Sequence, residues 1–330
     1  MGVHGSGRLS ELYQSLCSCI RICIFRVLSM GSIPDHIAFI MDGNRRYAKK
    51  NNFKEGAGHR AGFSSLISLL KCCYELGVKY VTVYAFSIDN FKRCPDEVKE
   101  LMDLMLEKME ELLQEESVVH QYGIRVYFIG NLKLLSESVR IAAEKVMKAT
   151  AHNTKCTLLI CIAYTSRDEI VNAVRESCTS KQAEIQSSNF YKANSVCAEE
   201  VKEGKKRDCV TKHGLHESPK NDADVECGKN MNGVITTAVQ RLYEESEKDS
   251  IIKAVDIEKH MYMSVAPEPD ILIRSSGETR LSNFLLWQSS NCVLYSPNAL
   301  WPEIGLWHLV WAVLNFQHNH PYLEKSRKQF

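Results

Sequence analysis

Short apolar runs alternate with longer stretches of helical periodicity along most of the chain. The apolar runs are rich in Val, Ile, Phe and Tyr, which is typical of strands, and they lie at residues 36–41, 79–87, 124–130, 156–163, 269–274 and 292–295. Between them, apolar residues three and four positions apart predict helices, notably at 61–76, 97–119, 136–150, 170–177 and 305–318. Strands that alternate with helices at this spacing build βαβ units. We therefore expect an α/β fold with a central, largely parallel sheet flanked by helices.

Two segments depart from this alternation. Residues 11–30 are apolar with a helical periodicity, but Arg21 and Arg26 interrupt the run, so no uninterrupted membrane-spanning stretch exists. A helix lying on a membrane surface and a helix packed against the protein body are equally consistent with it. Residues 178–232 are rich in Lys, Glu, Ser, Asn and Gly, which predicts a long flexible insertion. The expected organisation is a membrane-associating amphipathic helix at 1–32, one domain at 33–323 that carries the insertion, and a basic tail at 324–330.

Composition argues against several functional classes. The formal net charge of the 330 residues is +1, so no overall field attracts nucleic acid, and any anion site has to be local. The 13 cysteines are scattered and odd in number, and no secretory signal is visible, so we expect reduced thiols in a cytosolic compartment. Neither GxGxxG nor GxxxxGK[ST] occurs, which argues against dinucleotide and P-loop chemistry.

Three of the predicted strands end in acids, amides and arginines. The groups are Asp42 with Arg46, Asn90 with Arg93, and Arg274 with Arg280. Because open α/β sheets bind ligands at the carboxyl ends of their strands, we expect these groups to share one site. Guanidinium forks and helix N-termini bind phosphate, and a carboxylate binds Mg²⁺. Two anion sites and a single acid for the metal indicate two phosphorylated substrates side by side.

Structural explanations for the same residues remain open at this point. Residues 36–50, taken alone, are as consistent with a strand, a turn and a solvated basic helix as with a phosphate site. His59 lies in a glycine-rich stretch and could donate to a phosphate, although a surface or capping role is the commoner use of a lone histidine. Residues 284–287 predict the start of a buried helix that Ser282 could cap. The serines and glycine between Arg274 and Arg280 favour a diphosphate site.

Several long motifs together resemble a known family. They are HIAFIMDGNRRYAKK from residue 36, GHRAG from residue 58, YAFSIDNFKR from residue 84, and DILIRSSGETRLSNFLLWQ from residue 270, followed by LWPE. In this order they resemble the cis-prenyltransferases, the undecaprenyl and dehydrodolichyl diphosphate synthases, over about 34–176 and 233–320. YELGVKY, SIDNF and LMDLMLEK are particularly similar to the plant dehydrodolichyl diphosphate synthases and the latex enzymes linked to rubber.

The resemblance implies a reaction and a role for each candidate residue. The implied reaction is Mg²⁺-dependent condensation of isopentenyl diphosphate onto an allylic primer, usually farnesyl diphosphate, to make long-chain cis-polyprenyl diphosphate for dolichol or rubber. By this resemblance Asp42 holds Mg²⁺ on the primer diphosphate, and the residues that grip this diphosphate are Gly43, Asn44, Arg45, Arg46 and His59. Those implied for isopentenyl diphosphate are Arg93, Arg274, Arg280 and Ser282, with Ser87 and Asn90 near the reacting carbons. The growing chain is expected in a hydrophobic tunnel beside helix 97–119.

Two departures from the family pattern imply a partner subunit. Members that work alone have a Glu ligand to Mg²⁺ where this chain has Val293, and they end in an Arg-x-Gly motif that residues 325–330 lack. Both features resemble eukaryotic catalytic subunits that need a Nogo-B-receptor-like partner. We therefore expect a heteromer with weak activity alone, bound peripherally at the cytosolic face of the endoplasmic reticulum membrane or on lipid or rubber particles.

The alternative function is a non-catalytic scaffold subunit of a heteromeric prenyltransferase. Such subunits lose the acid and the arginines of the site. This chain keeps them, since it retains Asp42, Asn44, Arg46, Arg274 and Arg280.

Overall fold

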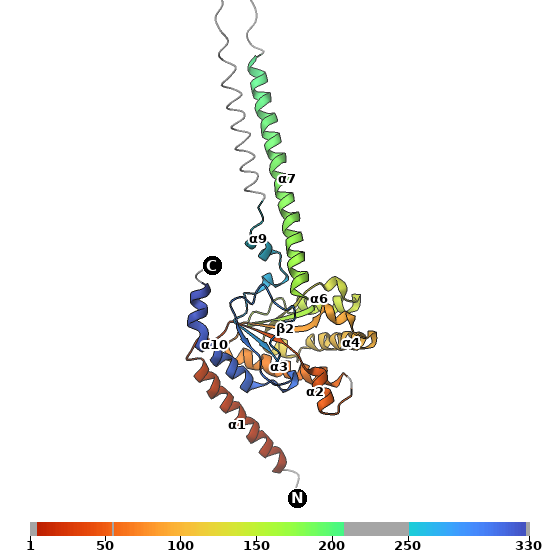
Figure 1. The fold of residues 1–330 in the computed structure, drawn as a ribbon, viewed down its shortest axis with the longest axis vertical. Helices are drawn as coiled ribbons and strands as arrows, with labels where there is room; N and C mark the ends of the chain where they lie inside the picture. The colour runs from red at the N-terminus through yellow and green to blue at the C-terminus, as the bar shows by residue number, and fades with distance from the viewer. Residues whose placement is uncertain (1–4, 55, 208–250, 328–330) are drawn as a thin grey trace, which may run out of the picture. The chain divides into compact units, whose positions relative to one another are not determined.

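Six parallel strands form the centre of the computed structural model, which describes residues 5–54, 56–207 and 251–327 (Figure 1). The strand order is β3-β4-β2-β1-β5-β6, and each neighbouring pair runs parallel. The strands are β1 His36–Ile40, β2 Tyr80–Ser87, β3 Ile124–Ile129, β4 Cys156–Tyr164, β5 Ile271–Arg274 and β6 Val293–Tyr295. The expected α/β fold is thereby confirmed, and each predicted strand has its counterpart.

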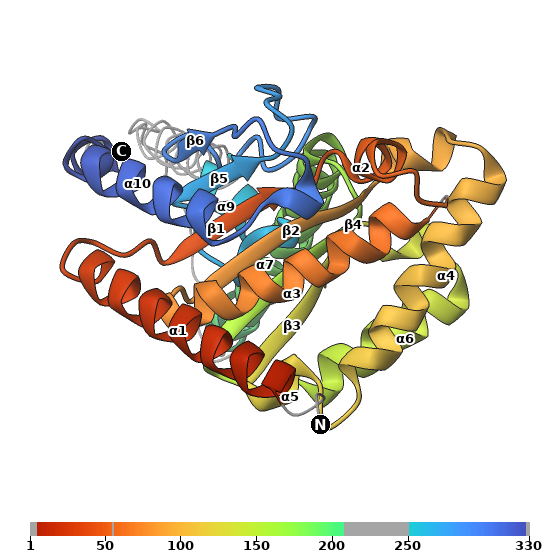
Figure 2. The same ribbon diagram turned by 90° about the horizontal axis from the view of Figure 1, so that it is seen from below.

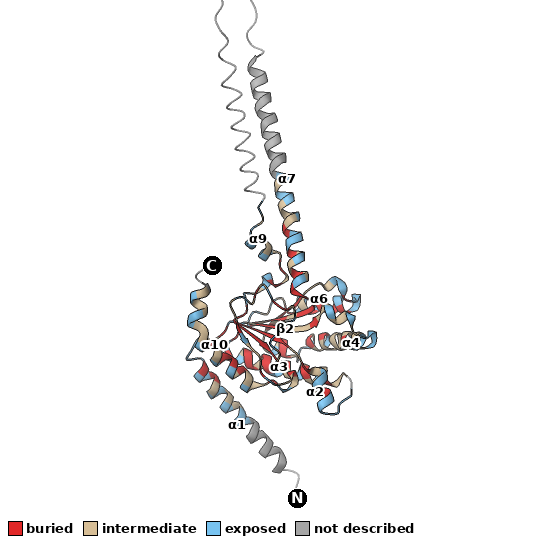
Figure 3. Cartoon of the chain, viewed as in Figure 1, coloured by how far each residue is buried: buried red, intermediate tan, exposed pale blue. Residues whose placement is uncertain are grey.

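Both faces of this sheet are covered, as the burial of a parallel sheet requires (Figure 3). All five residues of β1 are buried. Ile37 and Phe39 belong to one apolar cluster, which includes residues of α1, α3, α4, α6 and α10, whereas Ala38 and Ile40 belong to a second cluster with Phe284. The alternation follows from the two-residue repeat of a strand. The helices are α1 Gly5–Leu28, α2 Asn44–Lys50, α3 Ala57–Leu76, α4 Pro95–Leu112, α5 Val118–Gln121, α6 Glu137–Ala149, α7 Ser166–Arg207, α9 Ala254–Lys259 and α10 Leu306–Arg327.

The helix ends agree best with the prediction where a capping glycine or a first-turn proline marks them. Helix α3 ends at Gly77, whose φ of 93° is the left-handed conformation that a glycine C-cap adopts. Helix α4 starts at Pro95, a favoured first-turn residue, but it stops at Leu112 rather than near residue 119. The short helices of the chain are η1 Ile88–Lys92, η2 Leu132–Leu134, η3 Tyr262–Val265 and η4 Trp301–Glu303.

The chain divides into two compact units, of which one holds residues 1–170 and 262–330 and the other residues 171–261. Helix α7 continues to Arg207, past the end near residue 177 that apolar periodicity indicates. Its Lys, Glu, Gln and Ala residues are good helix formers, and they sustain a helix without an apolar face. Within the second unit, Ser177 Oγ donates to the main-chain oxygen of Asp256 at 2.9 Å. The rest of the predicted insertion, residues 208–232, lies outside the described residues.

The N-terminal helix α1 packs beside the C-terminal helix α10 (Figure 2). Phe25 and Leu28 of α1 are buried in the core, and Gln317 of α10 donates to the main-chain oxygen of Leu28 at 2.7 Å. In the described ranges, no helix combines the length and the apolar character that crossing a bilayer requires.

Candidate active site

Three neighbouring strands deliver the predicted polar groups to one edge of the sheet. The strands β2, β1 and β5 lie side by side, and their carboxyl ends lead to Asn90, Asp42 and Arg274 respectively. Parallel strands present all their carboxyl ends at the same edge, so groups far apart in sequence become neighbours. The structure therefore brings together the three strand ends that the sequence singled out.

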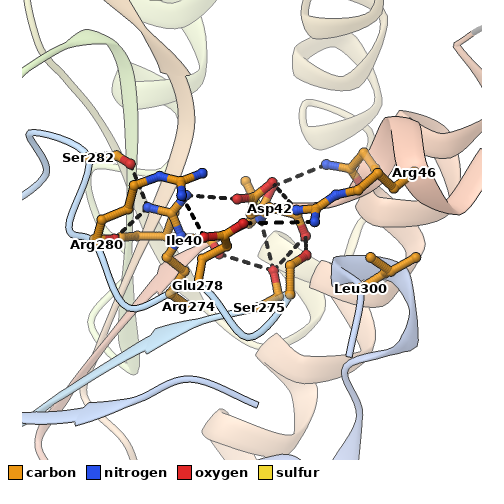
Figure 4. Close-up of polar contacts among 12 residues, drawn as sticks. Ile40, Asp42, Arg46, Arg274, Ser275, Glu278, Arg280, Ser282 and Leu300 are labelled. Carbon is orange, nitrogen blue, oxygen red and sulfur yellow. Dashed lines mark hydrogen bonds and ion pairs between the residues drawn. The ribbon is translucent and has the colours of Figure 1, made fainter. Parts of the chain in front are cut away.

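Asp42 lies between two arginines (Figure 4). One carboxylate oxygen pairs with the buried Arg274 at 2.7 Å, and the other pairs with the more exposed Arg46 at 3.1 Å. Burial raises the pKa of the Asp42 carboxyl, but the hydrogen bonds and charges of Arg274, and then of Arg46, outweigh burial and leave this pKa below its usual value. The group is therefore ionised at neutral pH.

The backbone at Asp42 is fixed by three donors to its carbonyl oxygen. They are Ser275 Oγ at 2.7 Å, Ser276 Oγ at 3.0 Å and the amide of Trp301 at 2.9 Å. The next residue, Gly43, has a φ of 104°, and a Cβ there would lie 2.5 Å from Ser276 Oγ. Only glycine fits this turn, because it tolerates both the left-handed backbone and the close approach.

Arg274 links Asp42 to the loop that follows β5. Its Nη1 atom donates to the carbonyl oxygen of Arg280 and to the hydroxyl of Ser282, both at 2.5 Å. Its Nε atom is buried and has no hydrogen-bond partner among the described residues. Buried donors are normally paired, so this unpaired N–H is an exception among the polar groups of the site.

Two glycines of the GHRAG motif let helix α3 approach helix α2 closely. A Cβ at Gly58 would lie 2.1 Å from the carbonyl oxygen of Asn44, and one at Gly62 would lie 2.2 Å from Asn44 Oδ1. His59, between them, has its pKa lowered by burial and then by the charge of Arg93. The imidazole is therefore neutral at neutral pH and keeps one N–H for donation.

The end of β2 carries a capping box. The Ser87 amide donates to Asn90 Oδ1 at 2.9 Å, and Ser87 Oγ accepts from the Asp89 amide at 3.1 Å. Two predicted arginines, Arg93 and Arg45, share the carboxylate of Glu97 at 2.8 and 3.4 Å. Sequence reasoning missed Glu97, since an acid in the first turn of a helix is ordinary there.

Two cavities meet at these residues. The smaller, of about 550 Å³, is polar and holds Arg46 and Arg280, while the larger, of about 690 Å³, extends under α4. Both are lined by Met41, Asp42, Asn44, His59 and Arg93. Every predicted site residue lines one or both cavities, namely Asp42, Gly43, Asn44, Arg45, Arg46, His59, Ser87, Asn90, Arg93, Arg274, Arg280 and Ser282.

The part of the larger cavity that lies away from Asp42 is lined mainly by apolar side chains. Its deeper lining comes from α3, α4 and strands β2, β3 and β4, and includes Leu66, Phe86, Leu101, Met105, Met109, Leu112, Phe128, Ile160 and Ile162. The apolar face of α4, whose partly buried Met and Leu residues look like ordinary core in the sequence, thus borders open space. Trp301 also lines this cavity, and its indole N–H donates to the carbonyl oxygen of Gly62 at 2.9 Å.

The prediction that a buried helix starts at residues 284–287 is wrong. The segment after Ser282 consists of turns, and Ser282, Asn283 and Leu285 have φ values of 48°, 59° and 46°. Non-local contacts override the local propensity, because Phe284 is fully buried and stacks on Tyr84 with ring centroids 4.5 Å apart.

Val293, the residue at the expected position of a second metal-binding acid, does not lie beside Asp42. It pairs with Ile271, which in turn pairs with Ile37, five residues before Asp42. Five residues of strand span roughly 16 Å. An acid at position 293 would therefore lie far from Asp42 within the same chain. Glu278 is nearer, since it lines the same polar cavity as Asp42.

The chain matches the Prenyltransf family model, that of undecaprenyl diphosphate synthase, over residues 40–222 and 228–323. It is 58% identical over 326 residues to dehydrodolichyl diphosphate synthase 6 of Arabidopsis thaliana. This alignment covers 99% of this chain and 97% of the relative. It is 47% identical over 323 residues to rubber cis-polyprenyltransferase HRT2 of Hevea brasiliensis, covering 98% of each chain. It is 36% identical over 311 residues to the human dehydrodolichyl diphosphate synthase complex subunit DHDDS, covering 94% of this chain and 74% of the relative.

A solved structure shows the same fold. Lavandulyl diphosphate synthase from Lavandula x intermedia superposes with a TM-score of 0.60 at 24% identity, covering 86% of this chain and 95% of that chain. The class that the family match and the fold together define is that of the prenyl diphosphate synthases. With the family match and the identities above, the chain belongs to the undecaprenyl diphosphate synthase family, the cis-prenyltransferases.

Proposed function

We propose that this chain is the catalytic subunit that condenses isopentenyl diphosphate onto an allylic diphosphate primer, farnesyl diphosphate or a similar one. The product is a long-chain cis-polyprenyl diphosphate for dolichol or rubber-type polyisoprenoid. The observation that carries the proposal is the junction of the two cavities, where a polar chamber rich in arginine opens onto an apolar one at Asp42. A diphosphate with a hydrocarbon tail matches this shape. The retained Asp42 and arginines do not favour a scaffold role.

The residues divide between two diphosphates. For the primer, Gly43, Arg45, Arg46 and the neutral His59 line the polar cavity, where amides, guanidinium groups and an imidazole N–H donate to phosphate oxygens. Isopentenyl diphosphate is assigned to the second group, namely Arg93, Arg274, Arg280 and Ser282. Arg274 Nε has no partner among the described residues, and this assignment would give that donor a phosphate oxygen.

The chemistry forms one carbon–carbon bond and breaks one carbon–oxygen bond and one carbon–hydrogen bond, whose electron pair becomes the new double bond. The terminal alkene carbon of isopentenyl diphosphate bonds to C1 of the primer, the primer diphosphate departs with the electron pair of the C–O bond, and one proton leaves the isopentenyl unit to form the new cis double bond. The arginines stabilise the negative charge that grows on the departing diphosphate. Ser87, Asn90 and Asn44 line the larger cavity near this junction and would orient the reacting carbons.

Mg²⁺ fits the donor set at Asp42. Mg²⁺ is held by one or two carboxylates together with substrate phosphates and waters, and Asp42 is an ionised carboxylate in a cavity that suits a diphosphate. Among the described residues, no group of three or more His, Cys, Asp or Glu side chains is placed to hold a metal ion. When bound, Mg²⁺ would neutralise charge on the departing diphosphate.

A partner subunit of the Nogo-B-receptor type completes the proposed enzyme. The support is the similarity to the human chain that is named as a complex subunit. We expect the purified chain alone to elongate weakly, and addition of the partner to raise the rate and the product length. Full long-chain synthesis by the single chain would overturn this part of the proposal.

The proposed location is the cytosolic face of the endoplasmic reticulum membrane or a lipid or rubber particle. Helix α1 exposes an apolar stripe of Leu16, Ile20 and Val27, and the neighbouring α10 exposes Trp307 and Trp311 at 68% and 62%. Residues 304–323 contain no Asp, Glu, Lys or Arg, which is unusual for a solvent-facing helix. Apolar stripes and tryptophans suit a lipid surface, which is also where a polyprenyl product would dissolve.

Liposome sedimentation tests this location. Trp307→Ser together with Trp311→Ser should weaken binding to vesicles of phosphatidylcholine and phosphatidylserine. Ile141→Ser, at an exposed apolar position on α6, is the matched control and should bind as the wild type does. Equal binding of all three proteins would contradict the assignment of α10 to the membrane.

The catalytic assignment is tested by Asp42→Ala. We expect turnover of farnesyl diphosphate and isopentenyl diphosphate to be lost while the circular dichroism spectrum shows that the variant stays folded, with a lower thermal midpoint because the buried Arg274 loses its partner. Asp35→Ala provides the control, because Asp35 precedes the other end of β1, and among the described residues its side chain pairs with the exposed Lys79. Normal turnover by Asp42→Ala would remove the mechanism.

A further inference from the structure

The turn that carries Ser282 has an unfavourable backbone. Three of the four residues from Ser282 to Leu285 have left-handed φ values, and none of them is glycine. Such residues persist only where the surroundings hold them in place. The contacts that hold this turn therefore decide where the Ser282 hydroxyl lies.

The first turn of helix α7 supplies these contacts. The Ser166 amide donates to the main-chain oxygen of Asn283 at 2.8 Å, and the Arg167 amide donates to Asn283 Oδ1 at 3.1 Å. In return, Ser166 Oγ accepts from the Leu286 amide at 2.9 Å. The side chain of Asn283 thus caps a helix more than a hundred residues earlier in the chain, and it satisfies amides that a helix start leaves unpaired.

From the other side, Arg274 holds the same turn. Its Nη1 atom donates to Ser282 Oγ at 2.5 Å, and its Nη2 atom pairs with Asp42 at 2.7 Å. Ser282 and Asn283 both line the larger cavity. A shift of the turn would move the serine hydroxyl and release one of the contacts that orient the guanidinium group.

We propose that Asn283 is a positioning residue for the second substrate. By capping α7 it keeps the 282–285 turn in its left-handed conformation, and so it places Ser282 and Arg274 for the diphosphate of isopentenyl diphosphate. This inference rests on the proposed function of the site. Asn suits the position twice, because it tolerates left-handed φ better than most residues and carries the acceptor that α7 needs.

Two substitutions separate the two properties. Asn283→Gly keeps the left-handed backbone but loses the acceptor, and we expect the KM for isopentenyl diphosphate to rise roughly fivefold, the worth of one hydrogen bond. Asn283→Ala loses both properties, and we expect a rise of roughly twentyfold or more. The KM for farnesyl diphosphate should stay within about twofold of wild type in both variants, since its residues lie in the turn after β1 and on α2 and α3.

The control is Asn153→Ala. Asn153 donates to the main-chain oxygen of Ile124 at 2.8 Å near the amino ends of β3 and β4, away from the site. Its loss removes a comparable hydrogen bond, so it should lower thermal stability without changing either KM.

The measurements are steady-state kinetics for both substrates with the full chain and its partner, and calorimetric binding of isopentenyl diphosphate. Equal KM values for wild type and Asn283→Ala, or equal rises for both substrates, would overturn the inference. If the alanine variant does not fold, the glycine variant decides alone, and an unchanged KM there also overturns it. Failure of the wild type to bind isopentenyl diphosphate would instead refute the proposed function.

Discussion

His36, the first residue of β1, makes the free energy of unfolding depend on pH. It is fully buried, its Nδ1 atom lies 2.7 Å from the carbonyl oxygen of Pro267, and its Nε2 atom lies 2.7 Å from Thr82 Oγ1. Since the Pro267 carbonyl only accepts, Nδ1 is the donor, and Nε2 accepts from the Thr82 hydroxyl. Burial lowers the pKa of His36 from 6.5 to about 4, against the smaller opposing effects of the Pro267 carbonyl and Asp270.

The magnitude follows from the two pKa values. The unfolded chain takes up a proton near pH 6.5, whereas the folded protein does so only near pH 4. The contribution of His36 is therefore present above pH 6.5 and is lost as the pH falls toward 4. At about 1.4 kcal/mol per pH unit, the full loss is roughly 3 kcal/mol, a sizeable part of the stability of an ordinary domain.

The assay is urea unfolding followed by tryptophan fluorescence at pH 7.5, 6.5, 5.5 and 4.5. His36→Asn keeps a donor for Pro267 but does not titrate, so we expect lower stability at pH 7.5 and a shallower decline between pH 6.5 and 4.5. His152→Asn, at an exposed position, should decline as the wild type does. If His36→Asn loses as much free energy over this range as the wild type, His36 does not carry the acid sensitivity.

Two further predictions concern the site itself. Gly58→Ala should force α3 away from α2, because its Cβ would meet the Asn44 carbonyl oxygen at 2.1 Å. From the usual cost of overpacking we expect the free energy of unfolding, measured with urea, to fall by about 1–3 kcal/mol. We also expect the KM for the primer to rise. Gly305→Ala, which meets nothing within 4 Å, is its control and should change neither quantity. Met109→Trp should fill part of the larger cavity, so mass spectrometry of the products should show shorter chains while the first condensation stays within about twofold of wild type. Unchanged product lengths would show that the growing chain does not occupy the space beside Met109.

The polar groups at the strand ends could be predicted because each lies next to its own apolar run in the sequence, and because a parallel sheet brings such ends together. Asp42, Asn90 and Arg274 each follow an apolar run, and parallel strands bring such ends to one edge whatever their order in the sheet. The order itself, which makes β1 the neighbour of both β2 and β5, could not be obtained from periodicity. The 2.7 Å contact between Asp42 and Arg274 depends on that order.

The turn after Ser282 could not be predicted, because its conformation is not determined by its own residues. Phe284 and its neighbours have the apolar pattern of a helix start, yet the segment is held by Ser166, Arg167 and Tyr84 from other parts of the chain. Glu97 escaped notice for a related reason. An acid in a first helical turn needs no explanation locally, and only the fold reveals that it pairs with Arg45 and Arg93.

The register of β6 changes the argument for a partner subunit. Val293 lies level with Ile37 at the start of β1, so the missing acid at position 293 does not leave a gap beside Asp42 in this chain. The polar cavity already holds Asp42 and Glu278 as carboxylates. The proposal of a partner subunit therefore does not rest on a missing metal ligand in this chain.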